Sequence, residues 1–282
     1  MDVTTIADDV GTSRGLRPRS LIVTIYGLYA REAGGWLSVG VLVRLMGELG
    51  VEAPAVRSSI SRLKRRGILV SERADGAAGY ALSDQARSIL DEGDRRIFER
   101  RRAATDDGWV LAVFSVPESE RQRRHQLRSR LSWLGFGTVA AGVWIAPGHL
   151  EEETRAVLER SGLTSYVDLF HASYLGFADV GAGVESWWDL GGLHRLYDDF
   201  IAAYRPVLAR WKRRRMVDPA DAFADYVRTL TAWRRLPFLD PGLPPELLPR
   251  DWHGARAADL FVELRQRLAE PARRHVDAVT MR

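Results

Sequence analysis

The chain has 282 residues, of which 46% are hydrophobic and 28% are charged, so it is long enough for two or three small domains with apolar cores. It contains no cysteine, which excludes disulfides, thiolate zinc sites and cysteine nucleophiles. The formal net charge is only +4, so local clusters of charge say more about nucleic-acid binding than the total does.

The chain lacks any run of about 18 consecutive apolar residues, so we expect no membrane span. Residues 1–10 do not show the basic region followed by an apolar region that marks a secretion signal, and we therefore expect a cytoplasmic protein. Residues 1–15 are polar and show no periodicity, and we expect this segment to be disordered.

Residues 16–82 carry the pattern of three helices followed by a hairpin. The first helix is expected over residues 18–33, where apolar residues form one stripe. After a short extended piece at 36–38, a second helix is expected to begin at the N-cap Ser38 and to end at Gly50.

A third helix is expected between Pro54, which suits a first turn, and Gly67, which suits a helix end. Val56, Ile60 and Leu63 recur at helical spacing and form its apolar face. The opposite face is basic, with short hydroxyl side chains between the cations: Arg57, Ser58, Ser61, Arg62 and Arg65. Because guanidinium groups bind guanine edges and phosphates while small residues permit close approach, this face suits the major groove of DNA.

A strand at 68–70, a loop at 73–79 and a return strand at 80–82 are predicted after this helix. The order of helix, strand, glycine-rich loop and strand is that of a winged helix, and we expect Arg73 to reach DNA from the wing. The alternative is an ordinary amphipathic helix with a solvated charged face, followed by a hairpin. The wing and the two preceding helices favour DNA binding.

A connecting helix is expected over Ser83–Arg102, within a linker that reaches residue 105. We favour a solvated face over direct phosphate contact for its basic end. Residues 106–180 then have the order strand, helix, strand, helix and strand, which predicts a small ferredoxin-like domain with its second strand at 139–145. The first helix of this domain is rich in arginine and could contact DNA or a phosphate-bearing ligand, although a solvated face is again favoured.

Residues 185–282 are predicted to form a helical domain, which makes the whole chain an α+β protein that is mostly helical. Pro206 falls inside a helical pattern and is expected to kink or end that helix. Residues 239–249 are expected to form an extended arm before a final helix that begins at Asp251. The pair at 187–188, two tryptophans, could stack on the aromatic ring of a ligand, but such a pair more often belongs to a core.

Three strings of the N-terminal domain, at residues 17–27, 35–39 and 55–63, together resemble the PaaX family of bacterial transcriptional repressors. The C-terminal string from 233 to 254 is similar to the last domain of that family, and the resemblance spans about residues 16–275. It implies regulation of a catabolic operon, with phenylacetic acid degradation as the namesake. It also implies release from DNA by an acyl-CoA thioester such as phenylacetyl-CoA, for which the sequence singles out no binding residues.

The middle domain also resembles the small ferredoxin-like subunit of the CRISPR adaptation machinery. Where those proteins are nucleases, an aspartate at the end of the first strand holds a metal ion. Here that position is Ser115, which is a poor magnesium ligand, and we see no carboxylate nearby in the sequence that replaces it. We therefore expect no nuclease activity.

Other catalytic or metal-binding constellations are not expected. The six histidines are scattered, and we find neither a histidine pair at i, i+4 nor a useful spacing between a histidine and a carboxylate. The motifs of dinucleotide, P-loop and nucleophile-elbow sites are absent. We expect no enzyme, no metal and no cofactor apart from a small-molecule effector, which is expected to be an acyl-CoA.

The sequence thus predicts a winged-helix transcriptional repressor that binds double-stranded operator DNA and leaves it when an aryl- or acyl-CoA binds. A single recognition helix reads too few base pairs for a genome-scale search, so we expect a homodimer on a palindromic operator. One alternative is a ferredoxin-like, metal-dependent nuclease with an appended DNA-binding domain. Another is a protein that associates with DNA non-specifically and has no effector.

Overall fold

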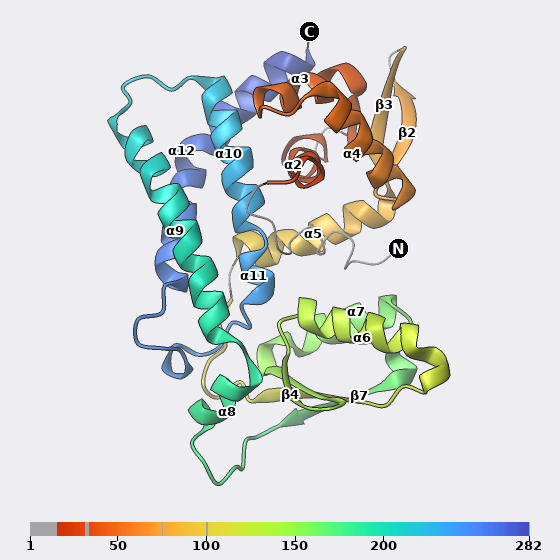
Figure 1. The fold of residues 1–282 in the computed structure, drawn as a ribbon, viewed down its shortest axis with the longest axis vertical. Helices are drawn as coiled ribbons and strands as arrows, with labels where there is room; N and C mark the ends of the chain where they lie inside the picture. The colour runs from red at the N-terminus through yellow and green to blue at the C-terminus, as the bar shows by residue number, and fades with distance from the viewer. Residues whose placement is uncertain (1–15, 32–33, 75, 100, 282) are drawn as a thin grey trace.

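The computed structural model describes residues 16–31, 34–74, 76–99 and 101–281. The expectation of disorder at residues 1–15 lies outside these ranges. Figure 1 shows a winged-helix unit at one end of the molecule, a bundle of long helices beside it and a small sheet with two helices at the other end. The predicted α+β, mostly helical class is confirmed.

The N-terminal unit has the predicted order of helices and strands. Its elements are α2 (Pro18–Ile25), the π-helical turn η2 (Tyr26–Ala30), β1 (Trp36–Ser38), α3 (Val39–Glu48), α4 (Ala53–Arg65), β2 (Leu69–Ala74) and β3 (Ala77–Leu82). The strands form an antiparallel sheet in the order β1-β3-β2. The Ser38 hydroxyl accepts a hydrogen bond from the Val41 amide, so the predicted N-cap of α3 is confirmed.

The hairpin after α4 is longer than the sequence predicted. Strand pairing extends to the register pair Ala74 with Ala77, so most of the expected loop at 73–79 is strand. Gly79, which falls within that expected loop, lies in β3 where β1 passes very close. A Cβ atom at Gly79 would lie 2.4 Å from the carbonyl oxygen of Leu37, so glycine is required there by the close approach and not by a turn.

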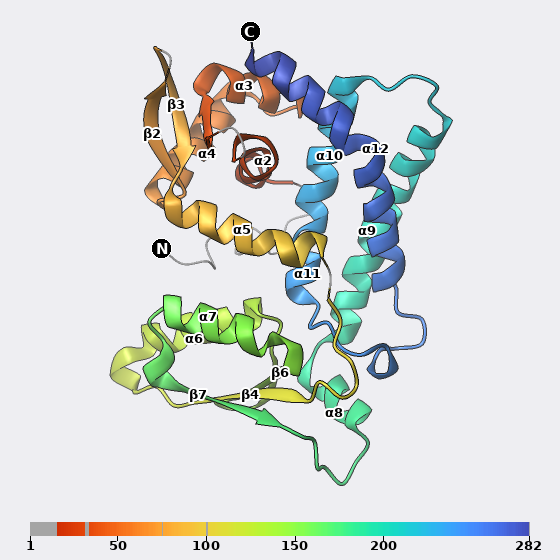
Figure 2. The same cartoon turned by 180° about the vertical axis from the view of Figure 1, so that it is seen from behind.

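The middle domain has the elements β4 (Trp109–Phe114), η3 (Glu118–Glu120), α6 (Arg121–Trp133), β5 (Gly137–Ala140), β6 (Val143–Pro147), η4 (Gly148–Leu150), α7 (Glu151–Arg160), η5 (Thr164–Tyr166) and β7 (Val167–Ala172). Its sheet is antiparallel in the order β5-β6-β4-β7. The single strand expected at 139–145 is two strands, because Gly142 adopts a φ of 76° and reverses the chain. Helices α6 and α7 lie between the sheet and α5 (Figure 2).

The connecting helix α5 (Asp84–Phe98) begins at the predicted cap Ser83 but ends before the expected Arg102. Residues 102 and 103 instead form hydrogen bonds with the C-terminal arm at residues 242 and 243. The Ala103 amide donates to the Gly242 carbonyl at 2.8 Å, and the Arg102 guanidinium donates to the Leu243 carbonyl at 3.2 Å. These long-range bonds compete with helix continuation and cannot be inferred from local periodicity.

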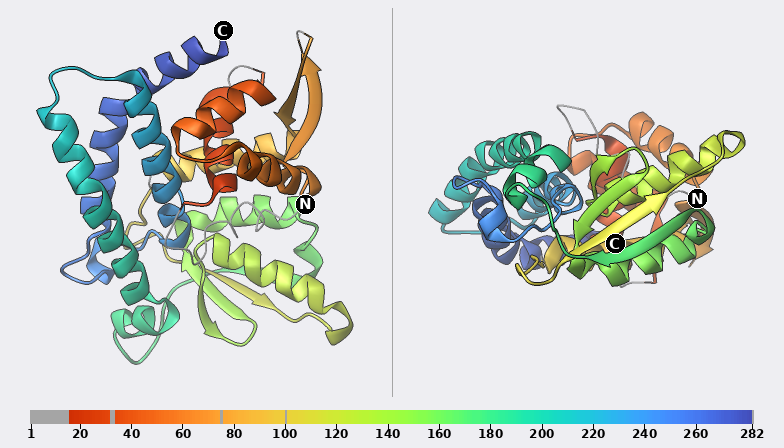
Figure 3. Two further views of the ribbon diagram at one scale, coloured as in Figure 1. Left: turned by 45° about the horizontal axis from the view of Figure 1, so that its top comes forward. Right: turned by 90° about the horizontal axis from the view of Figure 1, so that it is seen from below.

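The C-terminal part consists of α8 (Val180–Trp187), α9 (Leu190–Arg213), α10 (Pro219–Trp233), α11 (Leu236–Leu239), η6 (Pro245–Leu247) and α12 (Gly254–Thr280). Pro206 does not end α9, which continues to Arg213, and the last helix begins at Gly254 rather than at Asp251. Figure 3 shows the long helices α9, α10 and α12 side by side next to the winged helix.

The winged helix and the C-terminal helices share one hydrophobic core, although the sequence suggested separate domains. Helix α2 packs on α10, and the buried hydroxyls of Thr24 and Thr231 are 2.8 Å apart where the two helices meet. Trp233 stacks on Phe261 and donates its indole N–H to the Ile97 carbonyl at the end of α5. The molecule therefore consists of one large body and the middle domain.

The middle domain has its own core between the sheet and helices α6 and α7. A third apolar cluster joins the opposite face of the sheet to α8 and the C-terminal arm, and it contains Trp109 and the pair Trp187 and Trp188. The two tryptophans are therefore core residues, in agreement with the favoured interpretation. None of the helices in the described ranges has the length and apolar character that spanning a membrane requires.

Candidate DNA-binding face and inter-domain cavity

Helix α4 presents the predicted basic face to solvent. Val56, Ile60 and Leu63 are buried against the rest of the winged helix, as expected. The residues of α4 predicted to contact DNA are all exposed, and within the described part of the chain their side chains have no hydrogen-bond or ion-pair partner: Arg57, Ser58, Ser61, Arg62 and Arg65. They recur on one side of a 13-residue helix, which is about 20 Å long.

The end of α4 is fixed as the sequence predicted. Gly67 has a φ of 68°, and the Ile68 amide donates to the Leu63 carbonyl at 3.0 Å across it. The ammonium of Lys64 lies 5.5 Å from the centre of the Tyr80 ring on β3, so this cation rests on the wing. The arginines on the outer face of α4 remain available to a ligand.

The wing carries Arg73 at its exposed tip, but this side chain is folded onto its own hairpin. Its guanidinium donates to the Gly76 carbonyl at 3.0 Å. Since a guanidinium has about five N–H donors and that bond uses one of them, the group can still meet a phosphate. In Figure 1 the wing and α4 lie at the end of the molecule opposite to the middle-domain sheet.

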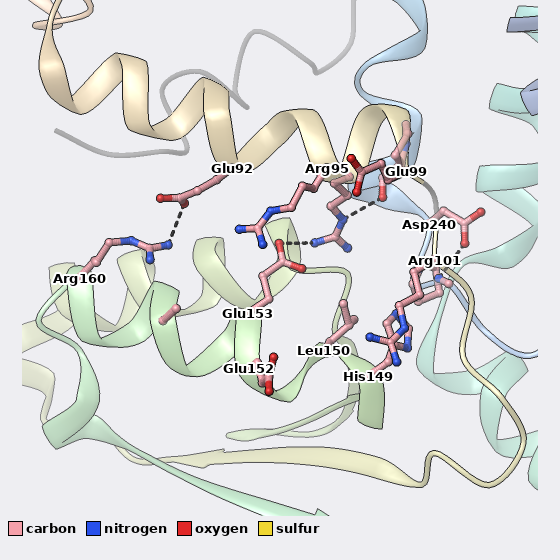
Figure 4. A pocket seen from close by; sticks show the side chains of 15 residues that line it. Glu92, Arg95, Glu99, Arg101, His149, Leu150, Glu152, Glu153, Arg160 and Asp240 are labelled. Carbon is pink, nitrogen blue, oxygen red and sulfur yellow. Dashed lines mark hydrogen bonds and ion pairs between the residues drawn. The ribbon is translucent and has the colours of Figure 1, made fainter. Parts of the chain in front are cut away.

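A cavity of about 520 Å³ lies where the connecting helix, the middle domain and the C-terminal arm meet (Figure 4). The lining comes from α5, from η4 and α7, and from residues 237–242. Figure 4 shows the guanidinium of Arg95 between α5 and α7, and that of Arg101 beside His149. The sequence did not predict this cavity, because its walls come from three segments that are far apart along the chain.

Arg96 fastens the three walls together. Its side chain is only 11% exposed, and its guanidinium donates to the carbonyls of Pro237 at 3.1 Å and Leu134 at 2.9 Å. It also pairs with Glu153 of α7 at 3.3 Å. Burial lowers the pKa of Arg96, while the charge of Glu153 works in the opposite direction. The basic end of α5 is therefore not wholly a solvated face, contrary to the favoured interpretation.

His149 lines the cavity beside Arg101. Burial, and secondly the nearby guanidinium of Arg101, lower its pKa from 6.5 to about 4. The imidazole is therefore neutral at about pH 7. Its Nδ1 atom is buried and has no hydrogen-bond partner in the described part of the chain, which is unusual for a buried polar atom.

A second cavity of about 330 Å³ lies between α5 and helices α6 and α7. Its lining includes Arg123, Gln126 and Trp133. Glu92 and Arg160 line both cavities, and their ion pair, with 2.7 Å between Nη2 and Oε2, stands between α5 and α7. The two cavities therefore belong to one cleft along α5, which this ion pair divides.

Ser115 follows β4 directly and is exposed. Asp168 on β7 stands opposite Val113 in the strand ladder, two residues before Ser115 on the neighbouring strand. Only the folded sheet brings it there. In the described ranges, no group of three metal-binding side chains gathers around this strand end.

The expectation that no histidine has a usefully spaced carboxylate is wrong for one histidine on α9. His194 and Asp198 lie four residues apart on α9, and His253 joins them, so that one possible ligand atom of each lies within 4.8 Å of the others. His253 Nδ1 is hydrogen-bonded to Asp198, and Arg256 lies 3.2 Å from His253 Nε2. The bond from His253 lowers the pKa of Asp198. Since both ring nitrogens of His253 are engaged and a guanidinium stands beside them, we interpret the cluster as a polar junction between α9 and α12.

Comparisons with known proteins agree with this architecture. Family profiles described as PaaX-like protein, PaaX protein central Cas2-like domain and PaaX-like protein C-terminal domain match residues 17–86, 102–183 and 188–278. The chain is 29% identical over 257 residues to the transcriptional repressor PaaX of Escherichia coli (strain K12), covering 90% of this chain and 81% of that protein. An uncharacterized protein from Mycobacterium tuberculosis has a similar fold, with a TM-score of 0.50 and 24% identity over 89% of this chain and 99% of that one.

Proposed function

This chain belongs to the PaaX family, and on that premise we propose that it is a transcriptional repressor of a phenylacetate-type catabolic operon, released from its operator by an aryl- or acyl-CoA. The observation that carries the DNA-binding part is the exposed outer face of α4, where Arg57, Arg62 and Arg65 lack partners in the described part of the chain. Beside them, the small side chains of Ser58 and Ser61 allow the helix to approach the walls of the DNA major groove closely. We also propose that the protein is not an enzyme, since Ser115 occupies the position where a related nuclease needs a metal-binding carboxylate.

The protein is proposed to act as a homodimer, since two recognition helices are needed for an operator of useful length. An uncovered apolar patch supports an interface between two copies, and it lies on the face of the middle-domain sheet that α8 and the C-terminal arm cover only in part. Val113 and Phe170 lie on this face, and the Phe170 side chain is 53% exposed. Isolated apolar residues are common on surfaces, but neighbouring ones on a sheet face suit a protein partner.

Light scattering of the full chain at micromolar concentration is expected to give about twice the 31.7 kDa of one chain. Phe170→Asp should shift the equilibrium toward the monomer, because a charge would be buried in the interface. Met216→Asp is the matched control, since this residue is 86% exposed in the turn between α9 and α10. A monomeric wild-type protein would contradict the dimer, and a dimer unaffected by Phe170→Asp would exclude this face.

The effector is tested by release of operator DNA across a panel of acyl-CoAs, the corresponding free acids and coenzyme A. A thioester such as phenylacetyl-CoA should lower DNA affinity about 100-fold, which corresponds to roughly 2.7 kcal/mol of coupling free energy. Because coupling is reciprocal, operator DNA should weaken thioester binding by the same factor. If free acids release the DNA as well as thioesters do, or if no thioester releases it, the effector class is wrong while the repressor assignment stands.

A further inference from the structure

We propose that the phosphate-bearing part of the effector binds in the cleft along α5, between this helix and α6 and α7. This inference rests on the proposed function, because it takes an acyl-CoA as the effector. The two cavities of the cleft measure about 520 and 330 Å³, and each is within the size range of small-molecule sites. A ligand that carries a nucleotide and a long acyl arm needs more than one such space, and the cleft offers two in a row.

The larger cavity offers the donors that phosphate groups require. Arg95 and Arg101 both line it, and neither guanidinium has a hydrogen-bond or ion-pair partner in the described ranges. Planar guanidinium groups bind phosphate oxygens with two parallel hydrogen bonds. The unpartnered Nδ1 of the neutral His149 supplies a further polar group beside Arg101.

The carboxylates around the cavity are mostly engaged, which keeps them from cancelling these cations. Glu153 pairs with Arg96, and Asp240 accepts a hydrogen bond from the Tyr197 hydroxyl at 2.7 Å. Figure 4 shows Glu152 on the side of α7 that faces away from Arg95. Glu99 remains, directly after the end of α5 and four residues after Arg95, and its charge in the cavity lining opposes an anionic ligand.

The cleft is also placed where a ligand can affect DNA binding. One wall is α5, whose N-cap Ser83 immediately follows the wing strand β3. The Ser83 hydroxyl donates to the carbonyl of Gly67 at 2.7 Å, so the start of α5 is bonded to the end of the recognition helix. A ligand that separates α5 from α7 has to open two ion pairs between these helices, Glu92 with Arg160 and Arg96 with Glu153. It thereby moves α5, whose start is bonded to the end of α4.

The test measures binding of phenylacetyl-CoA, coenzyme A and ATP to the full chain by calorimetry, without DNA. The double variant Arg95→Ala, Arg101→Ala should bind the thioester at least about tenfold more weakly, since it lacks two charge-assisted donors. Glu99→Gln should bind it a few-fold more tightly, which a merely unfolded variant cannot do. Arg155→Ala on α7 is the matched control, because its side chain is 58% exposed and pairs with Glu151 instead of lining the cleft.

The outcomes separate this inference from the proposed function. If the wild-type chain binds no thioester, the effector class and the site are both wrong. If it binds the thioester, but the double variant binds equally well or Arg155→Ala weakens binding as much, the cleft is excluded and the effector class stands. ATP binding as tight as that of phenylacetyl-CoA would show a general nucleotide site and would also overturn the inference.

Discussion

Replacing Arg57, Arg62 and Arg65 with alanine should reduce operator affinity at least about 100-fold and bring binding close to the non-specific level. An arginine that binds a guanine edge contributes about 1–3 kcal/mol, and about 1.4 kcal/mol is a factor of ten in affinity. The three side chains are exposed on one face of α4, while that helix is held by Val56, Ile60 and Leu63. The fold should therefore survive the substitutions.

The matched control for this variant removes three positive charges elsewhere. Arg205, Arg213 and Arg215 are exposed on α9 and just after it, far along the chain from the winged helix. A titration at several salt concentrations separates base binding from phosphate binding, because removing one cation that binds a phosphate lowers the salt dependence by about one unit. Equal reductions in affinity for the two triple variants would mean that the effect is one of total charge, and α4 would not be the reading helix.

Trp233→Ala should destabilise the winged helix together with the C-terminal helices, although the residue lies about 170 positions after α4 in the chain. Its indole is 2% exposed and packs on Phe200 and Phe261 in the shared core. Removal of a buried tryptophan side chain costs about 3–5 kcal/mol of unfolding free energy. Because one core serves both units, we expect the amides of α3 and α4 to lose protection from hydrogen exchange in the same variant.

Trp187→Ala is the control for this experiment, since that residue belongs to the apolar cluster beneath the middle-domain sheet. It should leave hydrogen exchange in α3 and α4 unchanged. The shared core would be disproved if Trp233→Ala weakened only the C-terminal helices and the winged helix kept its full protection.

The recognition helix could be predicted from sequence because every signal for it is local. Pro54, Gly67 and the apolar spacing between them determine where α4 lies and which face it exposes. The wing shows the limit of such reasoning. A side chain at Gly79 would collide with β1, which lies about 40 positions earlier in the chain. Periodicity cannot distinguish a glycine of this kind from one in a turn.

The cavity and the shared core could not be predicted for a related reason. Arg96 has the same local surroundings as its neighbour Arg95, and both line the cavity. Yet Arg96 is bonded into a three-way junction, while the guanidinium of Arg95 has no partner in the described ranges. The difference depends on the carbonyls of Pro237 and Leu134, which only the fold brings close. His194 and Asp198 are the opposite case, because their spacing of four residues is visible in the sequence itself.

The junction between the two bodies of the molecule has an apolar side and a polar side. On the apolar side, Trp109 of the sheet packs against Trp187 and Trp188, with ring centres 5.8 and 6.1 Å apart. On the polar side, two ion pairs connect α5 to α7, and Glu92 with Arg160 is the more exposed of them while Arg96 with Glu153 is the less exposed. Packed aromatic rings resist separation, whereas an exposed ion pair opens at little cost.

We expect the two bodies to separate first on the polar side, with the packed tryptophans as the pivot. Since the winged helix shares its core with the C-terminal helices, such a separation would move the whole large body relative to the middle domain. If two middle domains are held together in a dimer, the displacement would be largest at the far end of each large body, where α4 lies. The distance between the two α4 helices decides which spacing of half-sites the protein can bind.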